Sequence, residues 1–323
     1  MKSSSQLFPV SLMRADVIDD TYIEDTYLLK PNNSPDPTVQ VAVTRIGKYH
    51  QQGQGGIPIV LLHGAFNNHG CWQRPDGKGV AAALLEAGFD PWLVDLRGHG
   101  QSPVNHQYKF NNQELYAKYD LPALQAFIYE KNPTPAFWCG HSWGGVLVAT
   151  AIAMDALDMT KLAGSILMGS QTRRYPLALR LPFVRTFSKL YVAFKPQFIN
   201  LKIGPEAEPQ GIAKEFVRWA SIFRGWRTST GQSLKQAWKV MDVPLLVVAA
   251  PNDKSDPAKH CKRLYTLAEK SPKRDYVLLS KANGYSKNYG HLGMIASSQA
   301  VNDVWPNIIS WMQSVMGTSN SNK

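Results

Sequence analysis

The chain has few cysteines and no long hydrophobic run. Its 323 residues contain three cysteines, which lack the paired spacing of a zinc site or a disulfide framework: Cys71, Cys139 and Cys261. The longest apolar stretches, such as VPLLVVAAP at 243–251, are too short to span a bilayer. The N-terminal segment has no continuous apolar region of the kind that secretory signals carry. We therefore expect reduced thiols and a cytoplasmic location.

Acidic residues are scarce in one part of the chain. Residues 171–240 contain 13 Lys and Arg and only three acids, Glu206, Glu208 and Glu215, a local charge of +10. The remaining residues carry 22 bases and 21 acids, so the net charge of +11 comes almost entirely from this segment. Such a field disfavours cationic substrates and suits neutral, hydrophobic or anionic compounds.

Outside that segment, apolar runs alternate with helical patterns. Residues 21–46 read as an opening antiparallel pair of strands. Continuous apolar runs predict buried strands within 57–64, 89–100, 136–139, 161–170, 243–253 and 274–280. Helical patterns fall at 79–88, 111–131 with a break before Pro122, 144–157, 257–270 and 297–316. This alternation predicts an α/β fold with a mostly parallel sheet covered by helices on both faces. The core comprises 1–170 and 241–316, a mostly helical cap is inserted at 171–240, and 317–323 form a disordered tail.

The hexapeptide GHSWGG at 140–145 places a serine between an apolar strand and a helix of small residues. Gly140 and Gly144 leave space where strand and helix cross, so Ser142 can occupy a strained turn with its hydroxyl exposed at the sheet edge. This context favours a nucleophile over a serine that merely forms a turn.

A serine nucleophile needs a base and an acid that orients the base. His291 lies in the loop after the strand at 274–280, where the chain returns to the carboxyl edge of the sheet. Asp253 ends the strand at 243–253, and we favour it over Asp256, which we expect to cap the next helix. The resulting order is Ser142, Asp253, His291. The other histidines are interpreted as loop scaffolding or surface residues.

Five motifs together resemble those of α/β-hydrolase-fold serine hydrolases of the esterase and lipase group: LLHG at 61–64, DLRGHGQS at 95–102, GHSWGG at 140–145, APND at 250–253 and YGHLGM at 289–294. The resemblance covers most of residues 40–316. It implies an oxyanion hole formed by the backbone amides of Trp143 and Ala65, with Phe66 as the alternative to Ala65. It also places the basic insertion as a cap over the serine. For Asp95, Arg97 and His99 we expect structural roles.

These features predict an enzyme that cleaves carboxylic esters of lipid-like or other hydrophobic acyl groups through an acyl-enzyme. The same triad permits a thioesterase or an acyltransferase, and a relative with a broken triad would be a non-catalytic ligand-binding protein. We expect neither a cofactor nor a metal, because no histidines and carboxylates fall at metal-ligand spacing.

The expected partner is a small-molecule ester. RRYPLALRLPFVRTFSKLYVAFKPQFINL at 173–201 interleaves basic and apolar residues. One interpretation is an acyl-binding lid that associates weakly with anionic membrane surfaces; the other is a solvated cap whose apolar side covers the active site. We expect no nucleic acid partner, because no nucleic-acid motif accompanies the basic segment.

Overall fold

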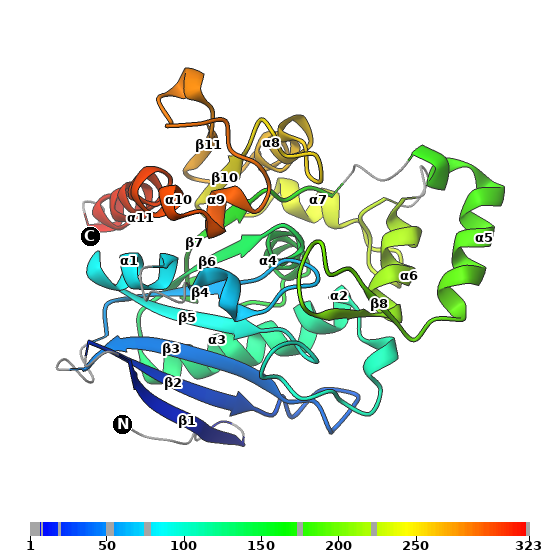
Figure 1. Cartoon of the computed structure of the whole chain (residues 1–323), viewed down its shortest axis with the longest axis horizontal. Helices are drawn as coiled ribbons and strands as arrows, with labels where there is room; N and C mark the ends of the chain where they lie inside the picture. The colour runs from blue at the N-terminus through cyan, green and yellow to red at the C-terminus, as the bar shows by residue number, and fades with distance from the viewer. Residues whose placement is uncertain are drawn as a thin grey trace.

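A nine-stranded sheet forms the centre of the molecule, in the order β1-β2-β3-β5-β4-β6-β7-β10-β11 (Figure 1). The structure, a computed structural model, describes residues 7, 9–18, 21–49, 55–73, 79–172, 177–220 and 225–320. The strands of the sheet are β1 (Val10–Ile18), β2 (Tyr22–Leu29), β3 (Val41–Lys48), β4 (Ile57–Leu62), β5 (Phe89–Asp95), β6 (Ala136–His141), β7 (Leu162–Met168), β10 (Leu245–Ala249) and β11 (Arg274–Leu278). Neighbours from β1 to β5 in this order are antiparallel, and those from β5 to β11 are parallel. The predicted α/β fold with a mostly parallel sheet is confirmed.

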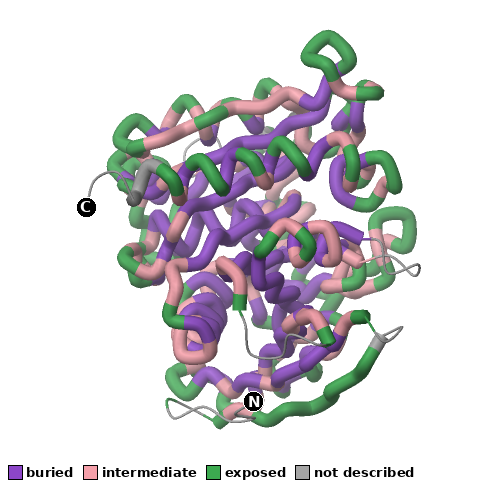
Figure 2. Tube along the Cα trace, turned by 90° about the vertical axis from the view of Figure 1, so that its left-hand side faces the viewer, coloured by how far each residue is buried: buried purple, intermediate pink, exposed green. Residues whose placement is uncertain are grey.

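Helices cover both faces of the sheet, which is why the central strands are apolar throughout. Along β4, Val60 and Leu62 belong to one apolar cluster, whereas Ile59 and Leu61 belong to another. The first cluster includes α3 (Leu121–Lys131), α4 (Trp143–Ala153), α7 (Leu234–Lys239) and α8 (Ala258–Leu267). The second includes α1 (Val80–Glu86), α9 (Gly293–Ala296), α10 (Ser298–Asp303) and α11 (Trp305–Asn320). Figure 2 shows the buried trace running through the interior and the exposed trace on the outer turns.

Strand β1 was not predicted from the sequence. It pairs with β2 at the edge of the sheet, and nearly all of its residues are exposed. A strand without a buried face carries no clear alternation of apolar and polar residues, so its pattern gives little signal. Arg14 on this strand pairs with Asp16 at 2.9 Å and with Glu24 of β2 at 2.8 Å. Charged side chains on an edge strand disfavour pairing with a second sheet.

Two predicted helices differ in detail. The pattern at 111–131 is divided into α2 (Gln113–Leu115), a π-helical turn (Tyr116–Asp120) and α3, so the break expected before Pro122 takes the form of that turn. At the C-terminus, the tail predicted to be disordered from residue 317 is wrong for its first residues, because α11 continues to Asn320. Once a helix is packed on a core, extending it by a residue adds a hydrogen bond at small entropic cost. Residues 321–323 lie outside the described range.

The insertion lies between β7 and β10. It contains a 3₁₀ turn (Leu177–Arg180), α5 (Pro182–Ala193), the antiparallel strands β8 (Gln197–Ile199) and β9 (Ala207–Pro209), and α6 (Gln210–Trp219). In Figure 1, α5 and α6 project beyond the end of the sheet. Helix α7 also falls within the predicted cap range, but its Leu234 and Trp238 are buried in the first cluster of the core. Residues 173–176 and 221–224 of the predicted cap lie outside the described residues.

Candidate active site

Ser142 occupies a strained turn between β6 and α4. Its backbone angles are φ 53° and ψ −119°, a conformation that costs a non-glycine residue about 1–3 kcal/mol. A β-carbon at Gly144 would lie 2.4 Å from the carbonyl oxygen of His63, and one at Gly140 would lie 2.4 Å from the backbone of Gly144. The two glycines therefore have the role expected for them, since only their close approach lets strand, serine and helix meet in this geometry.

His291 and Asp253 meet at the carboxyl edge of the sheet. Asp253 follows β10, His291 lies in the loop between β11 and α9, and His291 Nδ1 is 2.7 Å from Asp253 Oδ2. Burial disfavours the imidazolium, but the hydrogen bond and charge of Asp253, together with the charge of Asp256, raise the pKa of His291 above its ordinary value. Asp253 itself is buried. This pair can orient an imidazole and stabilise its protonated form.

Asp256 does not cap the following helix as expected from the sequence. Helix α8 begins at Ala258, its N-cap is Pro257 without a side-chain cap, and the amide of Asp256 donates to Asp253 Oδ1 at 2.7 Å. The Asp256 side chain faces Ser142. Ser142 Oγ donates to Asp256 Oδ2 at 3.3 Å, and the same oxygen lies 3.8 Å from Nε2 of His291.

The carboxyl group of Asp256 thus lies between the two groups predicted to exchange a proton. Across the described residues, no hydrogen bond joins Ser142 Oγ directly to His291 Nε2. Burial raises the pKa of Asp256 to about 6, although the charge of His291 opposes this shift. A carboxyl with such a pKa changes its charge in the pH range in which an imidazole does.

The loop after β4 carries the predicted oxyanion amide. A β-carbon at Gly64 would lie 3.0 Å from Cβ of Ser142, so this loop runs beside that serine. The amide of Phe66 donates to Glu208 Oε1 at 2.7 Å and is therefore occupied. The amide of Ala65 has no acceptor in the described part of the chain, and that of Trp143 begins a helix, where amides have no intrahelical acceptor. The geometry favours Trp143 and Ala65 over Phe66.

Two further histidines near the serine support the loops. His63 Nε2 accepts from the amide of Leu96 at 3.1 Å, so its Nδ1–H donates to the carbonyl of Gly64 at 2.8 Å. His141 Nε2 donates to the backbone oxygen of His291 at 3.0 Å. Burial lowers the pKa of His63 to about 4 and that of His141 to about 3. Both rings are neutral and hold neighbouring backbone.

The DLRGHGQS segment has the structural roles expected for it. Asp95 accepts from the amide of His69 at 2.8 Å, from its Nδ1 at 2.7 Å and from the amide of Gln101 at 2.9 Å. Arg97 is buried and donates through Nε to Asp120 Oδ2 at 2.7 Å. These contacts hold the loop that follows β5 in place.

The insertion contacts the core at Trp143, the residue after Ser142. The rings of Trp143 and Trp219, the last residue of α6, have centroids 5.7 Å apart and planes inclined by 33°. Helix α6 therefore lies over the start of α4, close to Ser142.

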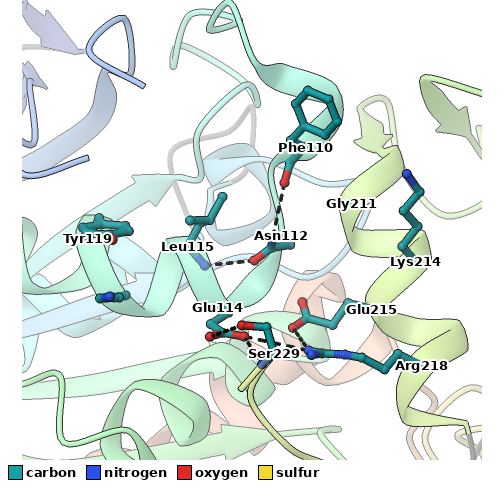
Figure 3. A pocket seen from close by; sticks show the side chains of 11 residues that line it. Phe110, Asn112, Glu114, Leu115, Tyr119, Gly211, Lys214, Glu215, Arg218 and Ser229 are labelled. Carbon is teal, nitrogen blue, oxygen red and sulfur yellow. Dashed lines mark hydrogen bonds and ion pairs between the residues drawn. The ribbon is translucent and has the colours of Figure 1, made fainter. Parts of the chain in front are cut away.

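A pocket of about 490 Å³ lies between the core segment 110–119 and α6 (Figure 3). Glu114 accepts from the amide of Ser229 at 2.6 Å and from its hydroxyl at 2.9 Å, and Arg218 donates to Glu215 at 2.8 Å. None of the predicted catalytic residues lines this pocket. The contacts of Ser229 join the insertion to Glu114 of the core, whereas Arg218 and Glu215 both belong to α6.

Over the described residues, no cluster of three or more His, Cys, Asp or Glu has the arrangement of a metal site. Among the helices of the same residues, none has the length and hydropathy needed to cross a membrane.

The family model described as "Alpha/beta hydrolase family" matches residues 59–304. A tear acid lipase-like protein of Mesocricetus auratus is 30% identical over 142 residues, and human gastric triacylglycerol lipase is 31% identical over 131 residues. These segments span 41% and 38% of this chain, but only 33% and 30% of the lengths of the two relatives.

Among solved structures, an esterase of Thermogutta terrifontis has a TM-score of 0.61 at 16% identity, covering 89% of this chain and 98% of its own. A monoacylglycerol lipase of Paleococcus ferrophilus has a TM-score of 0.58 at 17% identity, covering 86% and 99% respectively. These likenesses concern the fold, and the predicted α/β-hydrolase fold is confirmed.

Proposed function

The chain belongs to the alpha/beta hydrolase family, and from this premise we propose that it is a serine hydrolase that cleaves carboxylic esters with hydrophobic acyl groups. The observation that carries the proposal is the 2.7 Å hydrogen bond between His291 and Asp253 beside the strained turn of Ser142. A buried carboxylate on Nδ1 leaves Nε2 as the nitrogen that accepts a proton. Similarity to lipases over part of the chain supports the same reaction class.

In the acylation step, the hydroxyl of Ser142 turns from Asp256 to Nε2 of His291 and attacks the ester carbonyl. His291 takes the proton, and Asp253 stabilises the resulting imidazolium. The amides of Trp143 and Ala65 donate to the oxyanion of the tetrahedral intermediate. His291 then gives its proton to the departing alcohol, which leaves an acyl group on Ser142.

Water completes the cycle. His291 takes a proton from a water molecule that attacks the acyl-enzyme, the same two amides stabilise the second oxyanion, and Ser142 recovers its proton as the carboxylic acid departs. This chemistry uses only side chains and backbone of the chain. A thiol ester or a non-water acceptor would pass through the same steps, so a thioesterase or an acyltransferase remains the alternative within this mechanism.

A fluorophosphonate probe tests the nucleophile. We expect it to label the wild-type protein and to leave Ser142→Ala unlabelled, while p-nitrophenyl esters of increasing chain length and acyl-CoA thioesters reveal the preferred substrate. A folded wild-type protein that neither reacts with the probe nor turns over any substrate would contradict the proposal and favour the non-catalytic ligand-binding alternative.

The cap supports a lipid-like substrate, because α5 turns its apolar side outward. Phe183, Phe187 and Leu190 of α5 and Phe194, its C-cap residue, recur at helical spacing on one side and are 61%, 70%, 55% and 79% exposed. Of the α5 residues, Val192 alone is buried. This orientation favours the first interpretation of the basic segment over a cap whose apolar side covers the active site.

We propose that this outward side, defined by the four residues above, rests on an anionic lipid surface. Lys189 and Lys195 are the nearest basic residues around the helix, whereas the helical rotation of about 100° per residue places Arg185 on the opposite side. Each basic residue near such a surface contributes about 1 kcal/mol. The apolar side chains would enter the boundary between headgroups and acyl chains. This places the active site next to a source of hydrophobic esters. The cytoplasmic location stays a prediction.

Vesicle co-sedimentation tests this contact. We expect binding to vesicles that contain phosphatidylserine at low salt and release at high salt. Replacement of Phe187 and Phe194 by Ser should weaken binding, whereas Val104→Ser, at a residue 68% exposed and remote in sequence from α5, should not. Equal binding to neutral and anionic vesicles would refute the electrostatic part, and a dimer formed through α5 in solution would identify a second copy as the occupant.

A further inference from the structure

Residues 203–208 of the cap are joined to residues 65–68, the loop that carries the predicted oxyanion amide. The amide of Glu206 donates to the carbonyl of Phe66 at 3.0 Å, and Asn67 Nδ2 donates to the carbonyl of Ile203 at 3.3 Å. The contact is so close that a β-carbon at Gly204 would lie 2.0 Å from the oxygen of Phe66. A segment of the insertion thus rests directly on the loop beside the nucleophile.

Glu208 is the buried centre of this contact. Its side chain is largely shielded from solvent, and its Oε1 accepts from the amide of Phe66 at 2.7 Å and lies 3.3 Å from Nε2 of His99. Nδ1 of His99 lies 3.1 Å from the carbonyl of Arg97, so both ring nitrogens face acceptors, as they do in an imidazolium. A buried carboxylate that is also paired with a cation accepts hydrogen bonds in a narrow range of geometries, so it restricts the position of the donor.

The pKa values agree with an ion pair. Burial disfavours both charged forms, but the charge and hydrogen bond of the partner outweigh it, so the pKa of His99 is raised and the pKa of Glu208 is lowered. The Phe66 amide also helps to lower the pKa of Glu208. The carboxylate of Glu208, stabilised by the imidazolium of His99, therefore holds the Phe66 amide of the loop.

Phe66 needs such a restraint because of its backbone conformation. Its φ is 63°, in the left-handed region that non-glycine residues rarely adopt. Conformations of this kind persist where the surroundings hold them. Because Phe66 directly follows Ala65, the orientation of the Phe66 amide restricts that of the residue before it.

We propose that Glu208 is a positioning residue for the oxyanion hole: by holding the amide of Phe66, it keeps the amide of Ala65 directed at the substrate carbonyl. The inference rests on the proposed hydrolytic function. It makes catalysis depend on the cap segment 203–208 being seated on the loop. Since the donors of an oxyanion hole act on the transition state, loss of the restraint should lower kcat more than it raises KM.

Two substitutions separate the contacts of Glu208. Glu208→Gln keeps an oxygen for the Phe66 amide but removes the charge opposite His99, whereas Glu208→Ala removes both. Loss of one oxyanion donor costs about 10²- to 10³-fold in kcat, so we expect a decrease of at least about tenfold for Ala and a smaller one for Gln. Glu269→Gln, at a carboxylate on the exposed side of the core, is the matched control and should retain wild-type kcat.

A transition-state readout distinguishes positioning from loss of stability. The affinity for a trifluoromethyl ketone, which forms an oxyanion on Ser142, should fall by the same factor as kcat/KM, while KM changes by less than about threefold. Hydrogen exchange at residues 63–70 should accelerate in Glu208→Ala, even in a protein without activity.

Unchanged kcat and ketone affinity in both Glu208 variants would overturn the inference, as would a change in KM alone. If Glu208→Ala does not fold, Glu208→Gln tests the charged acceptor alone, and unchanged kcat, ketone affinity and hydrogen exchange in this variant would overturn the inference. If the wild type hydrolyses no ester, the proposed function fails separately, and hydrogen exchange decides whether Glu208 restrains the loop: accelerated exchange supports the restraint, and unchanged exchange refutes it.

Discussion

Replacing Asp256 by Asn should move the acid limb of the pH–rate profile toward lower pH. Asp256 Oδ2 lies 3.8 Å from His291 Nε2, and its negative charge is one of the causes that raise the pKa of His291. An imidazole must be neutral to accept the proton of Ser142. Without the carboxylate, the imidazolium is less stable, so the neutral base persists to lower pH.

The distance sets the size of the shift. Two unit charges 3.8 Å apart attract by about 1 kcal/mol in water and by about 4 kcal/mol at an effective dielectric constant of 20. Because about 1.4 kcal/mol corresponds to one pH unit, the limb should move by roughly 1 to 3 units. Both side chains are only 16% exposed, which limits screening by water, so we expect the upper half of this range. In the wild type, the carboxyl group of Asp256 and the imidazole of His291 titrate as a coupled pair. The acid limb of the variant should therefore be a single, sharper step.

The assay is kcat/KM for a short-chain p-nitrophenyl ester between about pH 4 and pH 9, which reports the groups of the free enzyme. Asp242→Asn makes the same change of charge at an exposed residue before β10, at the opposite end of that strand, and should leave the profile unchanged. An acid limb that stays in place, or moves to higher pH, would show that Asp256 is not an ionised neighbour of the His291 imidazole.

Three further predictions concern the turn, the acid and the attachment of the cap. Gly144→Ala should lower the free energy of unfolding by about 3 kcal/mol or more, because the new β-carbon meets backbone at 2.4 Å; thermal unfolding measures this, and a loss below about 1 kcal/mol would contradict the close-approach argument. Asp253→Asn should reduce kcat by about 10⁴-fold while KM and melting temperature change little, and steady-state kinetics that show less than about a tenfold loss would remove Asp253 from the proposed triad. Burial raises the pKa of Glu215 from 4.5 to about 7. The contribution of protonated Glu215 to the free energy of unfolding is therefore fully present below pH 4.5 and is lost as pH rises through about 7. Denaturant titrations should therefore show the free energy of unfolding of Glu215→Gln increasing relative to that of wild type as pH rises from 4.5 to about 7. A difference between the two proteins that does not change with pH would refute the raised pKa.

The sequence predicted those parts of the fold and site that depend on local pattern. Buried strands such as β4 are apolar on both faces, so they stand out against the helices between them. Ser142 is marked by the glycines around it. Asp253 and His291 follow parallel strands, whose carboxyl ends share one edge of the sheet.

The remaining features depend on contacts that local pattern does not encode. Asp256 precedes a proline and a helix, a setting typical of a cap, but its amide donates to Asp253, and its carboxyl group accepts from Ser142, a contact that joins distant parts of the chain. Glu208 meets Phe66 across 142 positions of the chain. The pattern of α5 shows that the helix has an apolar side, but the direction of that side follows from how the cap rests on the core.

The neighbouring rings of Trp143 and Trp219 give the protein an intrinsic optical probe of the insertion. Indole emission responds to the neighbours of the ring, and one of these rings belongs to the core while the other ends α6. Displacement of α6 would separate them and alter the intensity and wavelength of fluorescence without any attached dye. A Trp219→Phe variant isolates the signal of this pair from that of the other indoles, so seating of the cap can be followed in real time as esters or vesicles are added.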